Sequence, residues 1–353
     1  MILQRFSVTG TMITGKKFLK KFSLLIATAA LSTFCLGWLE TVYTHPTYSY
    51  AELPQTKNIL LSAVTEPQHV LVVPPDAPNR PVYSTTSGIT TFLAYGDETK
   101  RQFSLVIDVI PPGRETIPHI HTREDEFYYL VEGTAEVVTG SQTRVVTAGN
   151  LIFLPKGKRH GFKNIGSIPL KMLVAVTPAG FEGFFADQNR PVIDRSNPPA
   201  PEQDLTIIGQ LSQKYGAQPA LDPNTPSLGL SPLDFTVSSK DTPGRPSFNA
   251  AEGLFTFLAT SEETGGQFSL LDVSLLPQTR GRLVQLTQNN QQEAHTFYIL
   301  EGEVKFRFDN QTIVAAPGTT IYLPYGKQYA FQNNGTSPAK MVSLLVPPPA
   351  ATS

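Results

Sequence analysis

Three of the six histidines in this 353-residue chain and one glutamate fall close together at the spacing of metal ligands. His119 and His121 are two positions apart, Glu126 follows after a short polar segment, and His160 comes later. On a β-strand, residues i and i+2 point to the same face, so the first two imidazoles would enter one cavity. Three neutral imidazoles and a carboxylate suit one divalent transition metal (Fe, Mn, Ni, Cu or Zn) and leave positions open for substrate or O₂.

The elements that must position these residues are short strands joined by turns. The chain contains 30 prolines and 26 glycines between many short runs of Val, Ile, Leu and Phe, which is typical of an all-β protein. Glu126 opens the predicted strand 127–131, and His160 begins a later strand after the turn Pro155-Lys-Gly157.

Two segments around the candidate ligands resemble the two sequence motifs of the cupin superfamily. The first, residues 113–133, reads Gly, five residues, His-x-His, four residues, Glu, six residues, Gly. The second, residues 149–164, reads Gly, five residues, Pro-x-Gly, two residues, His, three residues, Asn. The resemblance implies a small β-barrel of the double-stranded β-helix or jelly-roll type, with His119, His121, Glu126 and His160 as its metal ligands.

The unit occurs twice in the chain. Residues 102–105, Gln-Phe-Ser-Leu, recur at 267–270, and the pattern of residues 149–157 recurs at 318–326. An internal repeat of this kind predicts an all-β protein of two tandem cupin barrels, a bicupin. A short helical connector is expected between them, because residues 204–215 have apolar residues at helical spacing and Gly216 is a plausible helix stop.

The second repeat keeps the turn residues but lacks the ligands. His160 corresponds to Tyr329 and Glu126 to His295, and less securely His121 to Asn290 and His119 to Gln288. Amide and phenol groups replace imidazole poorly at a transition metal, so the sequence predicts one metal, in the first barrel. For His295 and Tyr329, a weak site and a hydrogen-bonded pair inside the barrel remain alternatives.

The expected domain limits follow from these motifs. Residues 1–51 are expected to be a signal peptide or membrane anchor, because a basic segment at 16–21 precedes the apolar run 22–39 and a cleavage candidate ends at Ala51. Residues 52–188 are the expected N-terminal barrel with the metal site, and 189–231 a linker with flexible connectors on either side of its helix. Residues 232–350 are the expected C-terminal barrel without an intact metal motif.

Composition limits the partners. The net charge of −1 argues against nucleic acid, and Cys35 is the only cysteine, which leaves no disulfide framework. The chain is expected to be exported, periplasmic or extracellular, with membrane contact only through an uncleaved residue 22–39 segment. Homo-oligomers are common in the family, so a homo-oligomer is another expectation.

Three further groups have structural interpretations. His69 is expected to be a solvated or packing residue, because no partner lies at metal spacing. The basic cluster Lys156, Lys158 and Arg159 is expected to edge the cavity mouth as solvated charge, with attraction of an anionic substrate as the alternative. Phe181, Phe184 and Phe185 are expected to seal the barrel end, with a substrate lid as the alternative.

The reaction follows less directly from the sequence. The ligand pattern resembles that of quercetin 2,3-dioxygenases and related bacterial cupins, which implies an O₂-using dioxygenase acting on a flavonol-like or other enolic or phenolic small molecule. Glu126 would then be both ligand and catalytic base. The alternatives are an exported bicupin that only binds or senses a small ligand and an enzyme resembling oxalate decarboxylase or oxidase.

Overall fold

The computed structural model describes residues 69–201, 204–277 and 293–347, and all structural statements concern these residues. The predicted leader 1–51, its apolar run 22–39 and the positions Gln288 and Asn290 lie outside them. Within this part of the chain, no helix is long and apolar enough to cross a bilayer.

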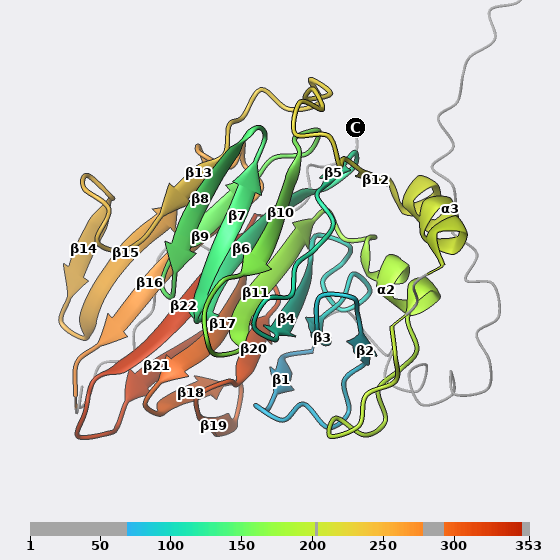
Figure 1. Cartoon of the computed structure of the whole chain (residues 1–353). Helices are drawn as coiled ribbons and strands as arrows, with labels where there is room; N and C mark the ends of the chain where they lie inside the picture. The colour runs from blue at the N-terminus through green and yellow to red at the C-terminus, as the bar shows by residue number, and fades with distance from the viewer. Residues whose placement is uncertain (1–68, 202–203, 278–292, 348–353) are drawn as a thin grey trace, which may run out of the picture. The chain divides into compact units, whose positions relative to one another are not determined.

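The first barrel consists of two antiparallel sheets (Figure 1). One sheet has seven strands in the order β13-β9-β6-β11-β4-β3-β2, and the other has five in the order β12-β5-β10-β7-β8. The strands of the first sheet are β13 (Thr236–Ser238), β9 (Leu151–Leu154), β6 (Asp125–Glu132), β11 (Leu170–Thr177), β4 (Ser104–Ile110), β3 (Ile89–Ala94) and β2 (Val82–Ser84). Those of the second are β12 (Ala217–Pro219), β5 (His119–His121), β10 (His160–Asn164), β7 (Thr134–Thr139) and β8 (Gln142–Thr147).

The second barrel repeats this plan with a seven-stranded sheet, β1-β20-β17-β22-β16-β15-β14, and a three-stranded sheet, β19-β18-β21. Its seven-stranded sheet comprises β1 (Leu71–Val73), β20 (Thr320–Leu323), β17 (Ala294–Glu301), β22 (Ala339–Val346), β16 (Ser269–Leu275), β15 (Gly253–Ala259) and β14 (Ser247–Ala250). The smaller sheet comprises β19 (Gln311–Ala315), β18 (Val304–Phe308) and β21 (Tyr329–Asn333). The predicted all-β fold of two tandem jelly-roll barrels is confirmed.

Each half of the chain supplies one edge strand to the other half's sheet. Strand β1 precedes the first barrel in the sequence but pairs with β20 of the second. Strand β13 follows the linker but pairs with β9 of the first. The sheets therefore mix strands from the expected ranges 52–188 and 232–350, and an edge covered in this way is protected from pairing with another molecule.

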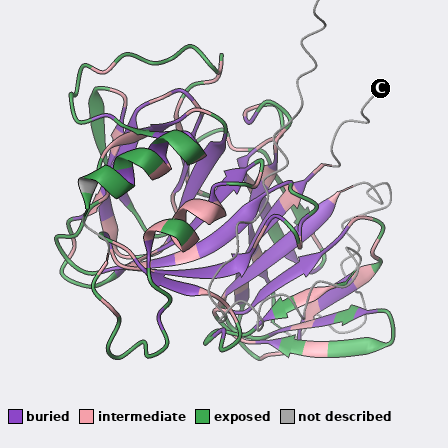
Figure 2. Ribbon diagram, turned by 90° about the vertical axis from the view of Figure 1, so that its right-hand side faces the viewer, coloured by how far each residue is buried: buried purple, intermediate pink, exposed green. Residues whose placement is uncertain are grey.

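Strand alternation gives each barrel an interior face and a face that packs against the other barrel. On β6, Tyr128 and Leu130 point into the first barrel, whereas Phe127 and Tyr129 join a cluster with residues of the second barrel such as Phe268. In Figure 2 many strands are coloured as buried over most of their length, whereas others contain exposed residues. One apolar core thus joins the two barrels.

The predicted connector helix is confirmed as α3 (Leu205–Tyr215). Asp204 caps its N-terminus by accepting a hydrogen bond from the Thr206 amide, and Gly216 ends it in the left-handed conformation, with φ of 74°. A shorter helix, α2 (Glu182–Gln188), lies beside α3 (Figure 1). Asp187 of α2 accepts hydrogen bonds from Lys214 and Tyr215, each at 2.6 Å.

The expectation of a flexible connector after this helix is wrong. The chain passes directly from Gly216 into β12, which pairs with β5, the strand that carries the His-x-His motif. The Ala220 amide donates to the Pro118 carbonyl at 2.7 Å, and the Thr122 amide donates to the Gly216 carbonyl at 2.9 Å. The linker therefore forms the edge of the sheet that positions two candidate ligands.

Candidate metal centre

Three strands bring the four predicted ligands together. His119 and His121 lie on β5, Glu126 on β6 and His160 on β10. His160 pairs directly with His119 across the β5–β10 ladder. One potential ligand atom from each of the four residues lies within 4.8 Å of the others.

Gly157 makes the approach to His160 possible. Its φ of 80° is a conformation that residues with a Cβ rarely adopt, and a Cβ there would meet Leu230 of the linker at 3.0 Å. The Gly157 amide donates to the His121 carbonyl at 2.7 Å, which ties the turn before β10 to the His-x-His strand.

The ligand atoms converge on one small volume. His119 Nε2 lies 3.2 Å from His121 Nε2, and Glu126 Oε2 lies 2.9 Å from His160 Nε2 and 3.7 Å from His121 Nε2. His121, Glu126 and His160 are buried, whereas His119 is only partly buried.

Two of the three imidazoles have a backbone acceptor at Nδ1, and that of His121 lies near a carboxylate without a hydrogen bond to it. His119 Nδ1 lies 2.9 Å from the Ile117 carbonyl oxygen, His160 Nδ1 lies 2.8 Å from that of Lys158, and His121 Nδ1 lies 3.5 Å from Glu124 Oε2. The two backbone acceptors favour a proton on Nδ1 and leave the Nε2 lone pairs of His119 and His160 directed at the shared volume. Metal-binding histidines commonly have such outer partners.

The electrostatics favour neutral histidine at the entrance and ionised glutamate inside. Burial, followed by the neighbouring His160 and His121, lowers the pKa of His119 to about 3. Burial alone would raise the pKa of Glu126, but His160, His121 and His119 together lower it to about 2. Burial likewise opposes the charge of His121, yet the carboxylates of Glu124 and Glu126 raise its pKa above the usual value.

The donor set fits a transition metal. Glu126 Oε2 and His160 Nε2 are buried and lack a hydrogen-bond partner, although they lie 2.9 Å apart. Buried polar atoms without partners are costly, and a cation held between them would satisfy both. The group of His119, His121, Glu126 and His160 could therefore hold a metal ion.

Glu124 was not among the predicted site residues. It is 4% exposed, and its Oε2 lies 3.5 Å from His121 Nδ1. The sequence signal was a second carboxylate in the polar segment before Glu126, three residues after His121. The alternation of side chains along a strand does not apply to a residue in a turn, so the orientation of Glu124 could not be predicted from the sequence.

The aromatic segment after β11 covers the site at His121. Phe181 is buried, and its ring lies edge-on to His121 with centroids 4.4 Å apart. Phe181 stacks on Phe184 at 5.0 Å and packs with Val176 and Ala217 of the linker strand. This arrangement agrees with the expected sealing of the barrel end.

The expectation of a solvated basic cluster is wrong for Arg159. Its side chain is buried and donates to the Ala220 carbonyl at 2.7 Å and to the Gly140 carbonyl at 2.8 Å. Lys158 forms an ion pair with Asp234 and lies over the Phe235 ring. Burial of a guanidinium requires such hydrogen bonds, and here they fasten the linker beside His160. His69, by contrast, is exposed, as expected.

The second barrel has no corresponding centre among the residues that the structure describes. His295 Nδ1 and the Tyr329 hydroxyl form a hydrogen bond inside the barrel, in agreement with one of the two expected alternatives. Phe297, Phe306 and Phe331 fill the space beside this pair, with ring centroids 5.2 to 5.6 Å apart.

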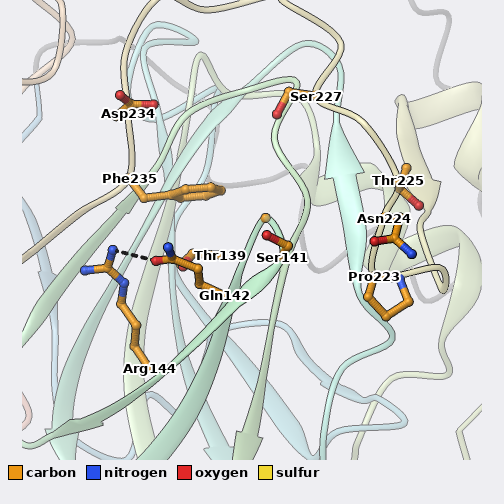
Figure 3. A pocket seen from close by; sticks show the side chains of 11 residues that line it. Thr139, Ser141, Gln142, Arg144, Pro223, Asn224, Thr225, Ser227, Asp234 and Phe235 are labelled. Atoms are coloured by element: carbon orange, nitrogen blue, oxygen red, sulfur yellow. Dashed lines mark hydrogen bonds between the residues drawn. The ribbon is translucent and has the colours of Figure 1, made fainter.

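A polar hollow of about 680 Å³ lies apart from the histidine cluster, between the β7–β8 hairpin and the linker (Figure 3). Its lining residues are Thr139, Gly140, Ser141, Gln142, Arg144, Pro223, Asn224, Thr225, Ser227, Asp234 and Phe235. None of the four candidate ligands lines it.

Sequence comparison identifies the repeated unit. A model described as "Cupin domain" matches residues 106–176 and again 280–345. The chain carries two cupin domains. The first match contains all four candidate ligands of this bicupin, and the second contains His295 and Tyr329.

Curated relatives match only part of this bicupin. An uncharacterized protein of Methanocaldococcus jannaschii, MJ1618, is 33% identical over 75 residues, which are 21% of this chain and 60% of that protein. The tetracenomycin polyketide synthase protein TcmJ of Streptomyces glaucescens is 30% identical over 70 residues, 20% of this chain and 46% of that protein.

Solved structures share the fold over most of the chain. The protein Ylba of Escherichia coli aligns with a TM-score of 0.53 at 11% identity, over 83% of this chain and 96% of that one. Oxalate decarboxylase of Bacillus subtilis, described by its Mn(II) centres, aligns with a TM-score of 0.52 at 13% identity, over 86% of this chain and 85% of that one. The 11S globulin procruciferin of Brassica napus aligns with a TM-score of 0.53 at 11% identity, over 79% and 84%. An enzyme and a globulin thus share this fold, so function must be argued from the site.

Proposed function

We propose that the first barrel is the active site of a metal-dependent dioxygenase that uses O₂ to oxidise a small molecule with an enolic or phenolic hydroxyl group. The convergence of three imidazoles and the Glu126 carboxylate within 4.8 Å carries this proposal. A divalent transition metal bound there would supply Lewis-acid and redox chemistry.

Glu126 is suited to take the proton of the substrate hydroxyl. It is a buried carboxylate that stays ionised beside three imidazoles, whose joint effect lowers its pKa to about 2. His119 and His160 keep their Nε2 lone pairs available because the Ile117 and Lys158 carbonyl groups provide acceptors at Nδ1. His119, the least buried of the four, marks the side from which a substrate would approach.

The Glu126→Gln variant separates proton transfer from the other functions of the site. Glutamine keeps the shape of the side chain, so we expect the variant to retain metal, with turnover at least about 100-fold lower. Elemental analysis would measure the metal, and loss of flavonol absorbance with and without O₂ would measure the reaction. The matched control is His119→Ala/His121→Ala, which should lose both metal and turnover.

Four outcomes would reject parts of the proposal. Turnover that survives without O₂ would reject a dioxygenase, and unaltered turnover in Glu126→Gln would remove this residue from the mechanism. Formate or peroxide from oxalate at acidic pH would instead favour chemistry of the kind named for the oxalate decarboxylase neighbour. A metal-independent ligand affinity, unchanged in His160→Ala, would favour a binding protein.

A further inference from the structure

Tyr128 is a buried hydroxyl in the interior of the first barrel, beside the ligand group. It lies two residues after Glu126 on β6 and therefore on the same face of the strand. Its ring lies edge-on to Phe162, with centroids 5.5 Å apart, and to His160 at 6.4 Å. Only 1% of the residue is exposed.

The Tyr128 hydroxyl has two acidic neighbours in the barrel interior, the carboxyl groups of Glu126 and Asp108. A phenol hydroxyl can donate a hydrogen bond to a carboxylate, which only accepts. Asp108 Oδ1 itself accepts a hydrogen bond from Thr90 at 2.6 Å.

The second barrel shows the same positions without the polar groups. Asp108 faces Thr90 across the β3–β4 ladder, and the corresponding pair across β15–β16 is Val273 and Phe255. On β6, which is separated from β4 by β11, Tyr128 corresponds to Phe297, which belongs to the apolar core of that barrel. The polar strip is thus present in the barrel that has the ligand group and replaced by apolar residues in the other.

The position after Tyr128 does not differ between the repeats. Tyr129 and its counterpart Tyr298 are both tyrosines, and both pack into the core between the barrels. Of these two tyrosine positions on β6, the repeats therefore differ only at Tyr128, which lies on the same face of the strand as Glu126.

We propose that Tyr128 is a positioning residue for Glu126: its hydroxyl donates to the Glu126 carboxylate and fixes the orientation of that group at the metal site, with Asp108 and Thr90 as polar support behind it. The assignment deepens the proposed function, on which the role of Glu126 as a base rests. Outer-shell partners of metal ligands set the orientation of the ligand and the affinity for the metal.

The test compares Tyr128→Phe with Tyr129→Phe in the full chain loaded with Co(II). Phenylalanine already occupies the equivalent place at Phe297, so Tyr128→Phe removes the hydroxyl without disturbing a strand that tolerates the ring. We expect Tyr128→Phe to weaken Co(II) affinity at least about 10-fold and to change the visible d–d absorption. Tyr129→Phe, which removes a buried hydroxyl on the opposite face, should leave both unchanged.

The outcomes separate this inference from the proposed function. Affinity and spectrum identical to wild type in Tyr128→Phe, or changed equally by Tyr129→Phe, would overturn the positioning role. The expected shift in a protein that consumes no O₂ with any enolic or phenolic compound would support the role and reject the dioxygenase. Failure of the wild-type protein to bind Co(II) would overturn both.

Discussion

At the residue scale, the two barrels show how a few inward-facing side chains decide whether a jelly roll contains a candidate metal site. The first barrel places ionisable groups inside, and the second fills the equivalent places with rings such as Phe297. An interior acid is costly because burial disfavours its charged form. Asp108 bears this cost most clearly, since burial raises its pKa to about 7 although the Thr90 hydroxyl opposes the shift.

The Asp108→Asn variant should change how stability depends on pH. A carboxyl whose pKa rises from 3.8 unfolded to about 7 folded lowers the free energy of unfolding progressively as pH rises through this window. The full shift corresponds to about 4 kcal/mol as an upper value. Asparagine cannot ionise, so the variant should match wild type near pH 4 and gain relative stability up to pH 7 and above.

Denaturant unfolding between pH 4 and pH 8, with a chelator present, would measure this difference. Asp272→Asn is the matched control, because burial also raises the pKa of Asp272 while Lys240 and Lys340 counteract it. Its pH dependence should therefore change less. If the free energy of unfolding changes with pH in the same way in Asp108→Asn and wild type, ionisation of Asp108 does not destabilise the fold.

At the element scale, the structure shows what the sequence could predict and what it could not. The ligands were predictable because histidine is rare in this chain and its spacing on β5 follows the strand period. The strand β12 was not, because its three residues, Ala217–Pro219, are too few to show alternation and include a proline, which tends to exclude strands except at sheet edges. The exchanged strands β1 and β13 were missed since pairing between distant segments leaves no local pattern.

The buried Arg159 is the residue through which this linker strand should influence the metal site. Its counterpart Gln328 in the second barrel is exposed, so Arg159→Gln substitutes the residue of a repeat that has no such clamp. Loss of its hydrogen bonds to Ala220 and Gly140 should lower the free energy of unfolding by about 2 kcal/mol. It should also loosen β12 and β5 together.

Hydrogen exchange of the amides of β12 and β5, measured beside metal affinity, would test this linkage. We expect faster exchange in both strands and weaker metal binding in Arg159→Gln. Lys163→Gln is the control, since Lys163 lies on the same strand as His160 but has a half-exposed side chain paired with Glu115. Faster exchange confined to β12, with unchanged metal affinity, would show that the linker does not position β5.

At the scale of the whole molecule, one core and two exchanged strands join the repeats. Phe268 of the second barrel packs on Phe127 and Phe153 of the first, with ring centroids 5.0 and 5.7 Å apart. Phe127 lies next to the ligand Glu126 on β6, and Phe153 lies on β9, the strand that pairs with β6. The second barrel, in which the described residues form no such ligand group, therefore supports the strand that carries Glu126.

Phe268→Ala should consequently destabilise both barrels as one unit. Phe268 is 1% exposed, and truncation of such a ring costs about 3 to 5 kcal/mol. The truncation leaves a cavity between the two barrels. We therefore expect the far-UV circular dichroism and the absorbance of bound Co(II) to be lost in one shared transition, at a lower temperature than in wild type. The control Phe248→Ala removes a 40% exposed ring that stacks on Phe255 at the far edge strand β14, and it should lower the transition much less. A partial loss of circular dichroism while the Co(II) absorbance persists would mean that the barrels unfold separately. The second barrel would then be dispensable for the metal site.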